Sequence, residues 1–280
     1  MTNKEIDSYI TSLESIGNIT DTYQQIASMR MRKIKDSVLQ NRAFYEPLLQ
    51  TYRDISNIYV KIYQKPFKQE ANGKSLAVLI SSNTGLYGGV VKAVFDLFVK
   101  DHEHSKFDLA VTGRLGRGWL DSLAIAKPYT YYELPDEISG ESTSVKELFG
   151  KIAAYSEIWV YHGIFNTIMD QSPKVTKIAQ NYSSEPAEQQ AATPIYLFEP
   201  SIESILENFE KQLLFSFFDQ SIYESSLAKY GSRMISLDAA GQNISRATAA
   251  AKLTRTRYRH LKQNKKQLEQ SSAFLVRRGG

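Results

Sequence analysis

Several residue types and patterns are missing from this sequence of 280 residues. It contains no cysteine, which excludes disulfides and thiol chemistry and fits a reducing compartment. The longest unbroken apolar run is residues 76–80, far short of the roughly 20 residues that a membrane-spanning helix needs. The first residues lack the basic and then apolar pattern of a signal peptide. We therefore expect a soluble chain whose role at a membrane is peripheral.

Proline is absent after Pro200, so the C-terminal stretch contains no residue that forces a helix to end. Apolar or small side chains recur there every three or four residues, which is typical of a long helix with one buried seam. The predicted seam includes Leu227, Met234, Leu237, Gly241 and Ile244. The small residues in the middle of this stretch would let a partner helix approach closely.

The N-terminal stretch shows the same spacing, with seam positions at Ile16, Ile19, Tyr23 and Ile26 and a later series from Tyr45 to Ile62. Ordinary amphipathic helices of a bundle are the commoner reading of such a pattern, but both stretches exceed the usual eight to about twenty residues. We predict that residues 1–64 and 201–280 form a long antiparallel coiled coil. Pro47 lacks a main-chain N–H, so we expect a kink or a break there.

The middle of the chain has a different pattern, in which short apolar runs alternate with helical stretches. Four strands are predicted at residues 76–80, 107–112, 158–161 and 195–198, with helices at 90–100 and 144–155. This order predicts a small doubly wound, Rossmann-like α/β domain over residues 74–200. Residues 167–192 suggest an extended segment and an exposed loop.

A glycine turn, residues 81–89, follows the first strand and includes Gly85, Gly88 and Gly89. It lacks the G-x-G-x-x-G spacing of a dinucleotide site and the lysine of a Walker A loop. We therefore interpret these glycines as structural, allowing the next helix to pack on the sheet. A dinucleotide-dependent enzyme is the least favoured of the functions considered.

The net charge is only +4, but basic residues are concentrated near the C-terminus. No acidic residue occurs between Asp238 and Glu269, whereas the same stretch contains Arg246, Lys252, Arg255, Arg257, Arg259, Lys262, Lys265 and Lys266. Such a run is usually a solvated face. Its density also fits a negative partner, either an acidic protein surface or a phosphate backbone. A basic helical nucleic-acid-binding protein is thus an alternative function.

The sequence contains no pattern that indicates catalysis. His102 and His104 are two potential metal ligands without a third, and no Ser/His/Asp set can be assembled from the sequence. We expect no cofactor, no metal site and no enzymatic activity of the chain itself.

Several motifs, in order along the chain, resemble the gamma subunit, or central rotor shaft, of F-type ATP synthases. Residues 10–20 are similar to that family's R-I-x-S-I-x-N-T-x-K-I-T, residues 81–89 to S-D-R-G-L-C-G-G, and residues 113–117 to G-x-K-G-R. Residues 161–165 are similar to Y-N-x-F, and residues 198–201 to E-P-S. Residues 232–240 resemble the A-R-M-V-A-M-D-N-A run at the start of the family's long C-terminal helix.

The resemblance implies a divergent, non-catalytic rotor shaft. It would couple proton or sodium flow through a membrane ring to ATP synthesis or hydrolysis in a ring of alpha and beta subunits. The implied partners are the alpha, beta and epsilon subunits and the proteolipid ring, at the cytoplasmic face of the plasma membrane, without nucleic acid. Residues at the family's ring-contact positions are Asn18, Asp21, Tyr23, Arg257, Arg259 and His260. The rotor of a specialised, hydrolysis-driven relative is the alternative.

Overall fold

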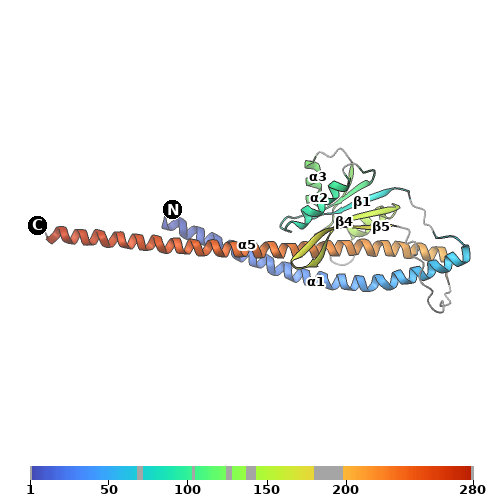
Figure 1. Ribbon diagram of the computed structural model, residues 1–280, viewed down its shortest axis with the longest axis horizontal. Coiled ribbons are helices and arrows are strands. Elements are labelled where there is room, and N and C mark those ends of the chain that lie inside the picture. Colours follow the sequence, from blue (N-terminus) through green and yellow to red (C-terminus); the bar gives the residue numbers. More distant parts are fainter. Residues whose placement is uncertain are drawn as a thin grey trace. The chain divides into compact units, whose positions relative to one another are not determined.

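The computed structural model describes residues 2–67, 72–102, 105–123, 128–136, 143–179 and 198–278. Two long helices lie at the ends of the sequence, with a mixed α/β region between them (Figure 1). The elements are α1 (Asn3–Tyr63), β1 (Ser75–Ile80), α2 (Val90–His102), β2 (Asp108–Thr112), α3 (Arg114–Ser122), β3 (Tyr129–Tyr132), α4 (Thr143–Ile152), β4 (Glu157–Thr167), β5 (Asp170–Ala179) and α5 (Ile202–Arg278).

The structure divides into two compact units. The terminal unit consists of Met1–Ser28 and Met234–Gly280, and the central unit is Met29–Arg233. Each unit therefore contains a part of α1 and a part of α5. None of the described helices has the length and apolar character needed to cross a membrane.

The sheet of the central unit has the strand order β3-β2-β1-β4-β5. The β1–β2, β1–β4 and β2–β3 pairs are parallel, and the β4–β5 pair is antiparallel. The chain adds β2 and β3 on one side of β1 and then returns to place β4 on the other side. This reversal of direction is the topological signature of a doubly wound fold, so the predicted fold class is confirmed.

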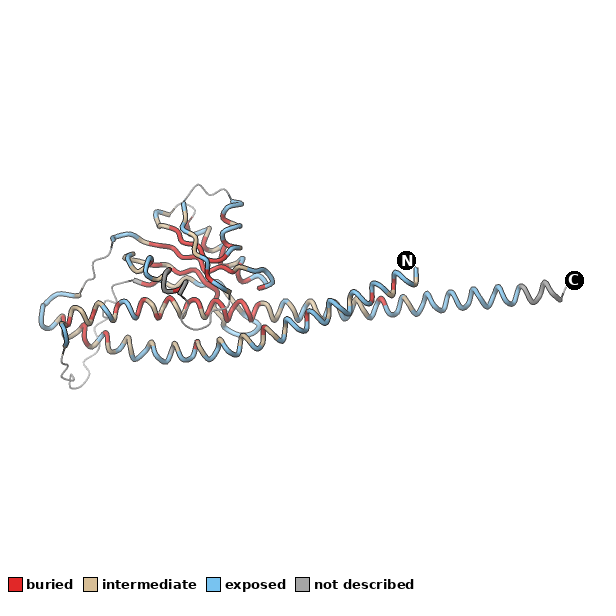
Figure 2. The backbone as a smooth tube through the Cα atoms, turned by 180° about the vertical axis from the view of Figure 1, so that it is seen from behind, coloured by how far each residue is buried: buried red, intermediate tan, exposed pale blue. Residues whose placement is uncertain are grey.

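Helices cover both faces of this sheet because the residues of β1 alternate between them. Ala77 and Leu79 pack with Phe95 and Phe98 of α2, whereas Val78 and its alternate neighbours pack with residues of α4 and α5. The buried positions gather in the sheet and on the neighbouring part of α5 (Figure 2). At about 1.5–3 kcal/mol for each fully buried large apolar side chain, this burial is the main contribution to the stability of the central unit.

The strands differ from the sequence prediction at the edges of the sheet. The structure contains β1, β2 and β4 close to the predicted positions, and also β3 and β5, which were not predicted as strands. β3 is a four-residue edge strand, and β5 contains Pro173 and several polar residues, so neither has a continuous apolar run. The predicted strand at residues 195–198 lies outside the described residues, except for Phe198.

We expected a kink or a break at Pro47, and the break was wrong, because α1 is a single helix through this position. Proline in a helix interior costs about 3 kcal/mol or more. On either side of it, however, Tyr45 and Leu48 pack against the cluster that contains the buried Tyr52 and Leu206. Burial of several large side chains, at about 1.5–3 kcal/mol each, is enough to outweigh the missing hydrogen bond.

Within the central unit α1 and α5 run antiparallel. Arg30 donates a hydrogen bond to the Tyr230 hydroxyl at 3.2 Å, and the Tyr52 hydroxyl donates one to Glu210 at 2.7 Å. The contact position on α5 moves back along the chain as the position on α1 moves forward, which is the pattern of two antiparallel helices.

Candidate functional site

The terminal unit is a pair of helices that also run antiparallel. Asp7 of α1 pairs with Arg255 of α5 at 3.3 Å. Further along α1, a Cβ on Gly17 would lie 3.5 Å from Ile244 of α5. The apolar cluster between the helices contains the buried Ile6 and residues from both chain ends. The two chain ends are therefore paired side by side in this unit.

Ile6, Ile10 and Leu13 were expected in the seam and pack against α5. From residue 16 onward, the side of α1 that faces α5 lies one position along from the expected seam. Thr20 and Ala27 are buried, whereas Tyr23 is 45% exposed. Ile16 and Ile19 are 50% and 56% exposed. Two sets of residues with similar spacing overlap in this sequence, and the partner helix selects the set that contains the smaller side chains.

This choice leaves an apolar face on the outside of α1. Tyr9, Ile16, Ile19 and Tyr23 share one side of the helix, because they are separated by three, four or seven residues. Large apolar side chains gathered on a solvent-facing surface mark a site of contact with another protein. We call these four residues the exposed apolar face. Its signal in the sequence was the second, overlapping spacing, which the prediction placed in the seam.

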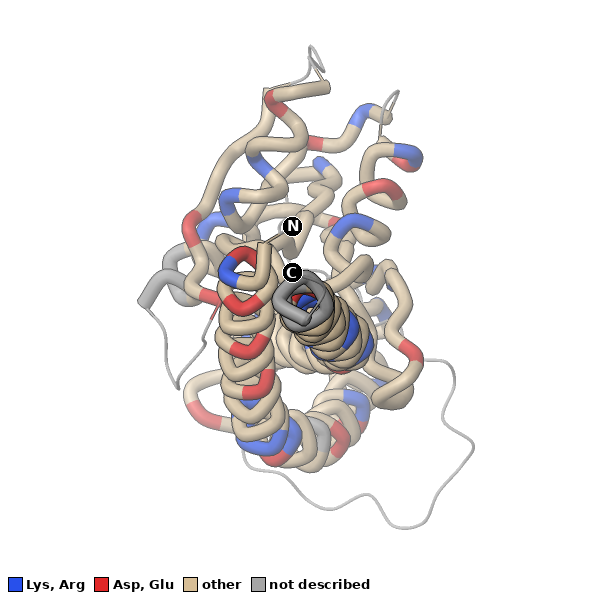
Figure 3. Tube along the Cα trace, turned by 90° about the vertical axis from the view of Figure 1, so that its left-hand side faces the viewer, with Lys and Arg blue, Asp and Glu red and all other residues tan. Residues whose placement is uncertain are grey.

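The basic stretch of α5 is partly neutralised by α1. Lys252 pairs with Glu14 at 2.8 Å, in addition to the Asp7–Arg255 pair. Figure 3 shows acidic positions along α1 near the N-terminus and basic positions along α5 near the C-terminus. Arg257, Arg259 and His260 are exposed. Exposed pairs of this kind are worth only about 0–1 kcal/mol each, so the stretch remains a surface that favours an acidic partner.

A groove of about 480 Å³ lies between the helices of the terminal unit. It is lined by Asn18 and Asp21 of α1 and by Asp238, Gly241 and Ile244 of α5, among others. A Cβ on Gly241 would meet nothing within 4 Å. Gly241 therefore lines the groove and is not required for a close helix contact.

The other residues of the predicted α5 seam are divided between the two units. Leu227 is buried in the central unit, and Met234 and Leu237 are half-buried in the terminal unit. On α1, Ile26 is half-buried. Close approach in the central unit occurs at Gly231, where a Cβ would lie 2.9 Å from the Phe165 ring of β4.

The glycine turn, residues 81–89, follows β1 and contains Gly85, Gly88 and Gly89. Gly88 has a φ of 59°, a conformation that favours glycine. A Cβ on Gly85 or on Gly89 would meet nothing within 4 Å, so tight packing does not explain these two glycines. The tight contacts are instead at Gly113, where a Cβ would lie 2.6 Å from the main-chain nitrogen of Ser82.

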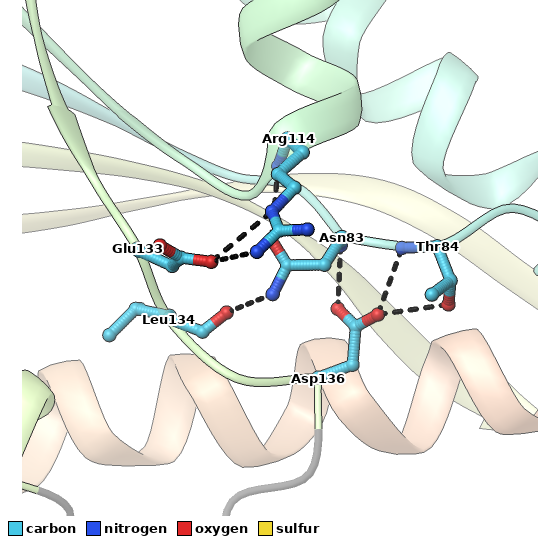
Figure 4. Close-up of polar contacts among 6 residues, drawn as sticks. All are labelled: Asn83, Thr84, Arg114, Glu133, Leu134 and Asp136. Atoms are coloured by element: carbon cyan, nitrogen blue, oxygen red, sulfur yellow. Dashed lines mark hydrogen bonds and ion pairs between the residues drawn. The ribbon is translucent and has the colours of Figure 1, made fainter.

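A hydrogen-bond network closes the glycine turn against the segment that follows β3 (Figure 4). The Asp136 carboxylate accepts hydrogen bonds from the main-chain N–H groups of Asn83 and Thr84, at 2.8 and 3.0 Å, and from the Thr84 hydroxyl at 3.0 Å. The Asn83 amide donates to the Leu134 carbonyl and accepts from the Arg114 N–H. The Arg114 guanidinium pairs with Glu133.

Doubly wound sheets hold ligands beyond the carboxyl ends of the strands, where the strand order reverses. In this structure that place lies between β1 and β4, and α5 fills it. The small space lined by Ile80, Val90, Gly163, Ser225 and Lys229 has no room for a water molecule. The Lys229 ammonium donates a hydrogen bond there to the Ser81 carbonyl. The chain's own helix therefore occupies the crevice that would hold a nucleotide.

The buried histidines, His102 and His162, act as hydrogen-bonding groups of the fold. A ring nitrogen of the buried His102 lies 2.8 Å from the Tyr161 hydroxyl and the other lies 2.8 Å from the Ser105 hydroxyl. Its potential metal-binding neighbour, residue 104, lies outside the described residues. Burial lowers the pKa of His162 below its ordinary value. Within the described part of the chain, no three His, Asp or Glu side chains are grouped as a metal site would require.

Comparisons with known proteins identify the family. The family model described as ATP synthase matches residues 2–265. The ATP synthase gamma chain of Actinobacillus succinogenes is 26% identical over 257 residues, which are 86% of this chain and 87% of that protein. The chain belongs to the ATP synthase gamma family.

Solved structures of ATP synthases share the fold of this gamma-family chain. The rotor of the Euglena gracilis mitochondrial ATP synthase matches with a TM-score of 0.65 at 13% identity, covering 92% of this chain and 97% of that one. The central stalk of the Tetrahymena thermophila mitochondrial enzyme matches with a TM-score of 0.55 at 17% identity, covering 79% and 99%. The long terminal helices and the mostly parallel sheet are therefore the gamma-family architecture.

Proposed function

We propose that this chain is the non-catalytic central rotor shaft of an F-type ATP synthase. In this function it couples proton or sodium flow through the membrane ring to ATP synthesis or hydrolysis in the alpha/beta ring. The observation that carries the proposal is membership of the gamma family over residues 2–265. The antiparallel pairing of α1 and α5 supports it, because two wound helices resist twisting better than one.

The proposed partners are the alpha and beta subunits, the epsilon subunit and the proteolipid ring, at the cytoplasmic face of the plasma membrane. The similar Euglena gracilis structures are described as containing a rotor, F1 and a c-ring. We divide the chain by role into residues 1–64 and 201–280, which form the shaft, and residues 74–200, which form the α/β domain. The shaft itself requires no active site.

Two surfaces of the terminal unit are suited to contact the alpha/beta ring. The exposed apolar face of α1 offers Ile16, Ile19 and Tyr23 for burial. On α5, Arg257 and Arg259 are exposed cations that would bear on acidic loops. The apolar contacts would hold the shaft in the ring. The strength of the charged contacts would change with the orientation of the shaft as it turns.

Purification of the tagged chain from its own cell tests this function. We expect alpha, beta and proteolipid subunits, identified by mass, to co-purify and the complex to pump ions in vesicles when ATP is added. Failure of alpha and beta to associate with the chain would refute the assignment. Association with alpha and beta but without a proteolipid ring would identify the hydrolysis-driven relative instead.

A further inference from the structure

The side of α5 that packs on the sheet changes character along the helix. Leu214 and Phe218 belong to the apolar core below the sheet. Further along, Ser225, Ser226 and Lys229 are buried although they are polar. Polar groups are costly to bury unless they are hydrogen-bonded, and Ser226 and Lys229 donate hydrogen bonds to the Ile222 and Ser81 carbonyls. Hydrogen bonds also fix the relative position of two surfaces, because they are directional, whereas an apolar contact lets the surfaces slide.

Two cations of α5, one helical turn apart, hold the glycine turn. Lys229 donates to the Ser81 carbonyl. Arg233 donates from Nε to the Leu86 carbonyl at 3.0 Å and from Nη2 to the Gly85 carbonyl at 3.1 Å. The Arg233 guanidinium also lies 3.9 Å from the centre of the Tyr87 ring. Three carbonyls of one short turn are thus bound by one helix.

The same turn is held from its other side by the α/β domain. Asp136 binds the N–H groups of Asn83 and Thr84, and the Asn83 side chain connects to the segments that follow β2 and β3. The turn therefore has a donor network on one side and an acceptor network on the other. It cannot rotate with α5 and leave the sheet behind unless these bonds break.

The helix also approaches the sheet too closely to slide. A Cβ on Gly163 of β4 would lie 3.1 Å from the Ala228 side chain, and a Cβ on Gly231 would lie 2.9 Å from Phe165. These contacts lie on either side of Lys229 along α5, so the register and the rotation of the helix are set at this point.

We propose that Lys229 and Arg233, by gripping the glycine turn, form the joint that transmits torque between the α/β domain and α5. The inference rests on the proposed rotor function and assigns to these residues a positioning role within it. Lys229 lies in the crevice where other doubly wound domains bind a ligand, and Arg233 binds the glycine turn one helical turn further along α5.

The test uses the assembled complex and the Lys229→Met variant. Methionine keeps the length and the apolar stem but cannot bind Ser81. Burial lowers the pKa of Lys229 to about 8, so the ammonium is costly to bury and we expect the Met variant to fold. Arg233→Gln removes the fork to Gly85 and Leu86 and serves as a second variant. Lys211→Met is the matched control, because Lys211 is an exposed lysine of α5 that pairs with Glu207.

Three quantities are measured: ATP hydrolysis, ATP-driven ion pumping, and amide hydrogen exchange of residues 81–89. In both joint variants we expect exchange of the turn to be about tenfold faster and fewer ions to be pumped per ATP hydrolysed. The control should match the wild type in all three measurements.

The possible results distinguish failure of the proposed joint from failure of the proposed rotor function. If the wild type pumps and the joint variants pump equally well per ATP, the joint is overturned and the rotor function stands. Unchanged exchange in the turn also overturns the joint, because it shows that the two cations do not hold it. If the wild-type complex hydrolyses ATP without pumping, the coupling function fails, and the torque role fails with it.

Discussion

The Tyr52 hydroxyl of α1 donates a 2.7 Å hydrogen bond to the Glu210 carboxylate of α5, inside the helix pair of the central unit. The other oxygen, Oε2, is buried without a hydrogen-bond partner among the described residues. The pKa of Glu210 is raised to about 7, mainly by burial. The hydrogen bond from Tyr52 opposes this rise, and the nearby Glu207 adds to it. Below about pH 7 the protonated carboxyl is therefore favoured in the folded chain.

This relationship predicts a pH-dependent stability. The folded chain binds the Glu210 proton more tightly than the unfolded chain, whose pKa is near 4.5. The free energy of unfolding should therefore fall as the pH rises from about 4.5 to about 7 and remain lowered above that range. Glu210→Gln should raise it at pH 8 by about 1–3 kcal/mol and have little effect at pH 4. Urea unfolding of the isolated chain at both pH values measures this, and an equal effect of the substitution at both would contradict it.

Substitution by alanine should change the stability of the chain in opposite directions at two glycines of α5. Gly231→Ala places a Cβ 2.9 Å from Phe165, and such overpacking costs about 1–3 kcal/mol. Gly241→Ala meets nothing within 4 Å and gains about 0.5–1 kcal/mol of helix propensity. Thermal unfolding compares the two variants, each serving as the control for the other. Higher stability of the Gly231 variant than of the Gly241 variant would show that α5 does not pack on β4 as described.

The exposed apolar face should matter for assembly and not for folding. Ile16→Ser combined with Ile19→Ser should leave the melting temperature of the isolated chain nearly unchanged, because surface substitutions usually lie within about 0.5 kcal/mol. Binding of the variant to alpha and beta subunits should weaken at least tenfold, measured by titration into the purified ring. The matched control is Ile10→Ala, which removes a buried side chain and should cost about 2–5 kcal/mol of stability. Wild-type ring binding by the double variant would rule out this face as a contact.

Arg257 and Arg259 provide a test of the basic stretch. We expect their joint replacement by Ala to reduce ion pumping per ATP several-fold while the subunit still folds and assembles, because both side chains are exposed. Pumping and hydrolysis are measured in reconstituted vesicles at low and at high salt, since charged contacts weaken with ionic strength. Unchanged coupling at low salt would mean that the two arginines are merely solvated.

Local signals were sufficient for much of the fold. The apolar run of β1, the glycine turn and the pattern of α2 predict a parallel α/β unit, and the absence of proline after Pro200 predicts the uninterrupted α5. Edge strands β3 and β5 were missed because an edge strand is only partly buried and needs no apolar run. The effect of Pro47 was overestimated because its cost is local, whereas the packing that offsets it comes from α5, more than a hundred residues away in the chain.

The sequence by itself determined the class of the fold, the two long terminal helices and the gamma family, because periodicity and motifs depend on residues that are close together in the chain. Only the tertiary structure decided which side of α1 is buried in the terminal unit. Two sets of residues have nearly the same spacing: Gly17, Thr20 and Ala27, and Ile16, Ile19 and Tyr23. The packing of α5 decides which of the two sets is buried. The tertiary structure also decided that Lys229 and Arg233 bind the turn at residues 81–89. That contact joins residues almost 150 positions apart, and no local pattern encodes it.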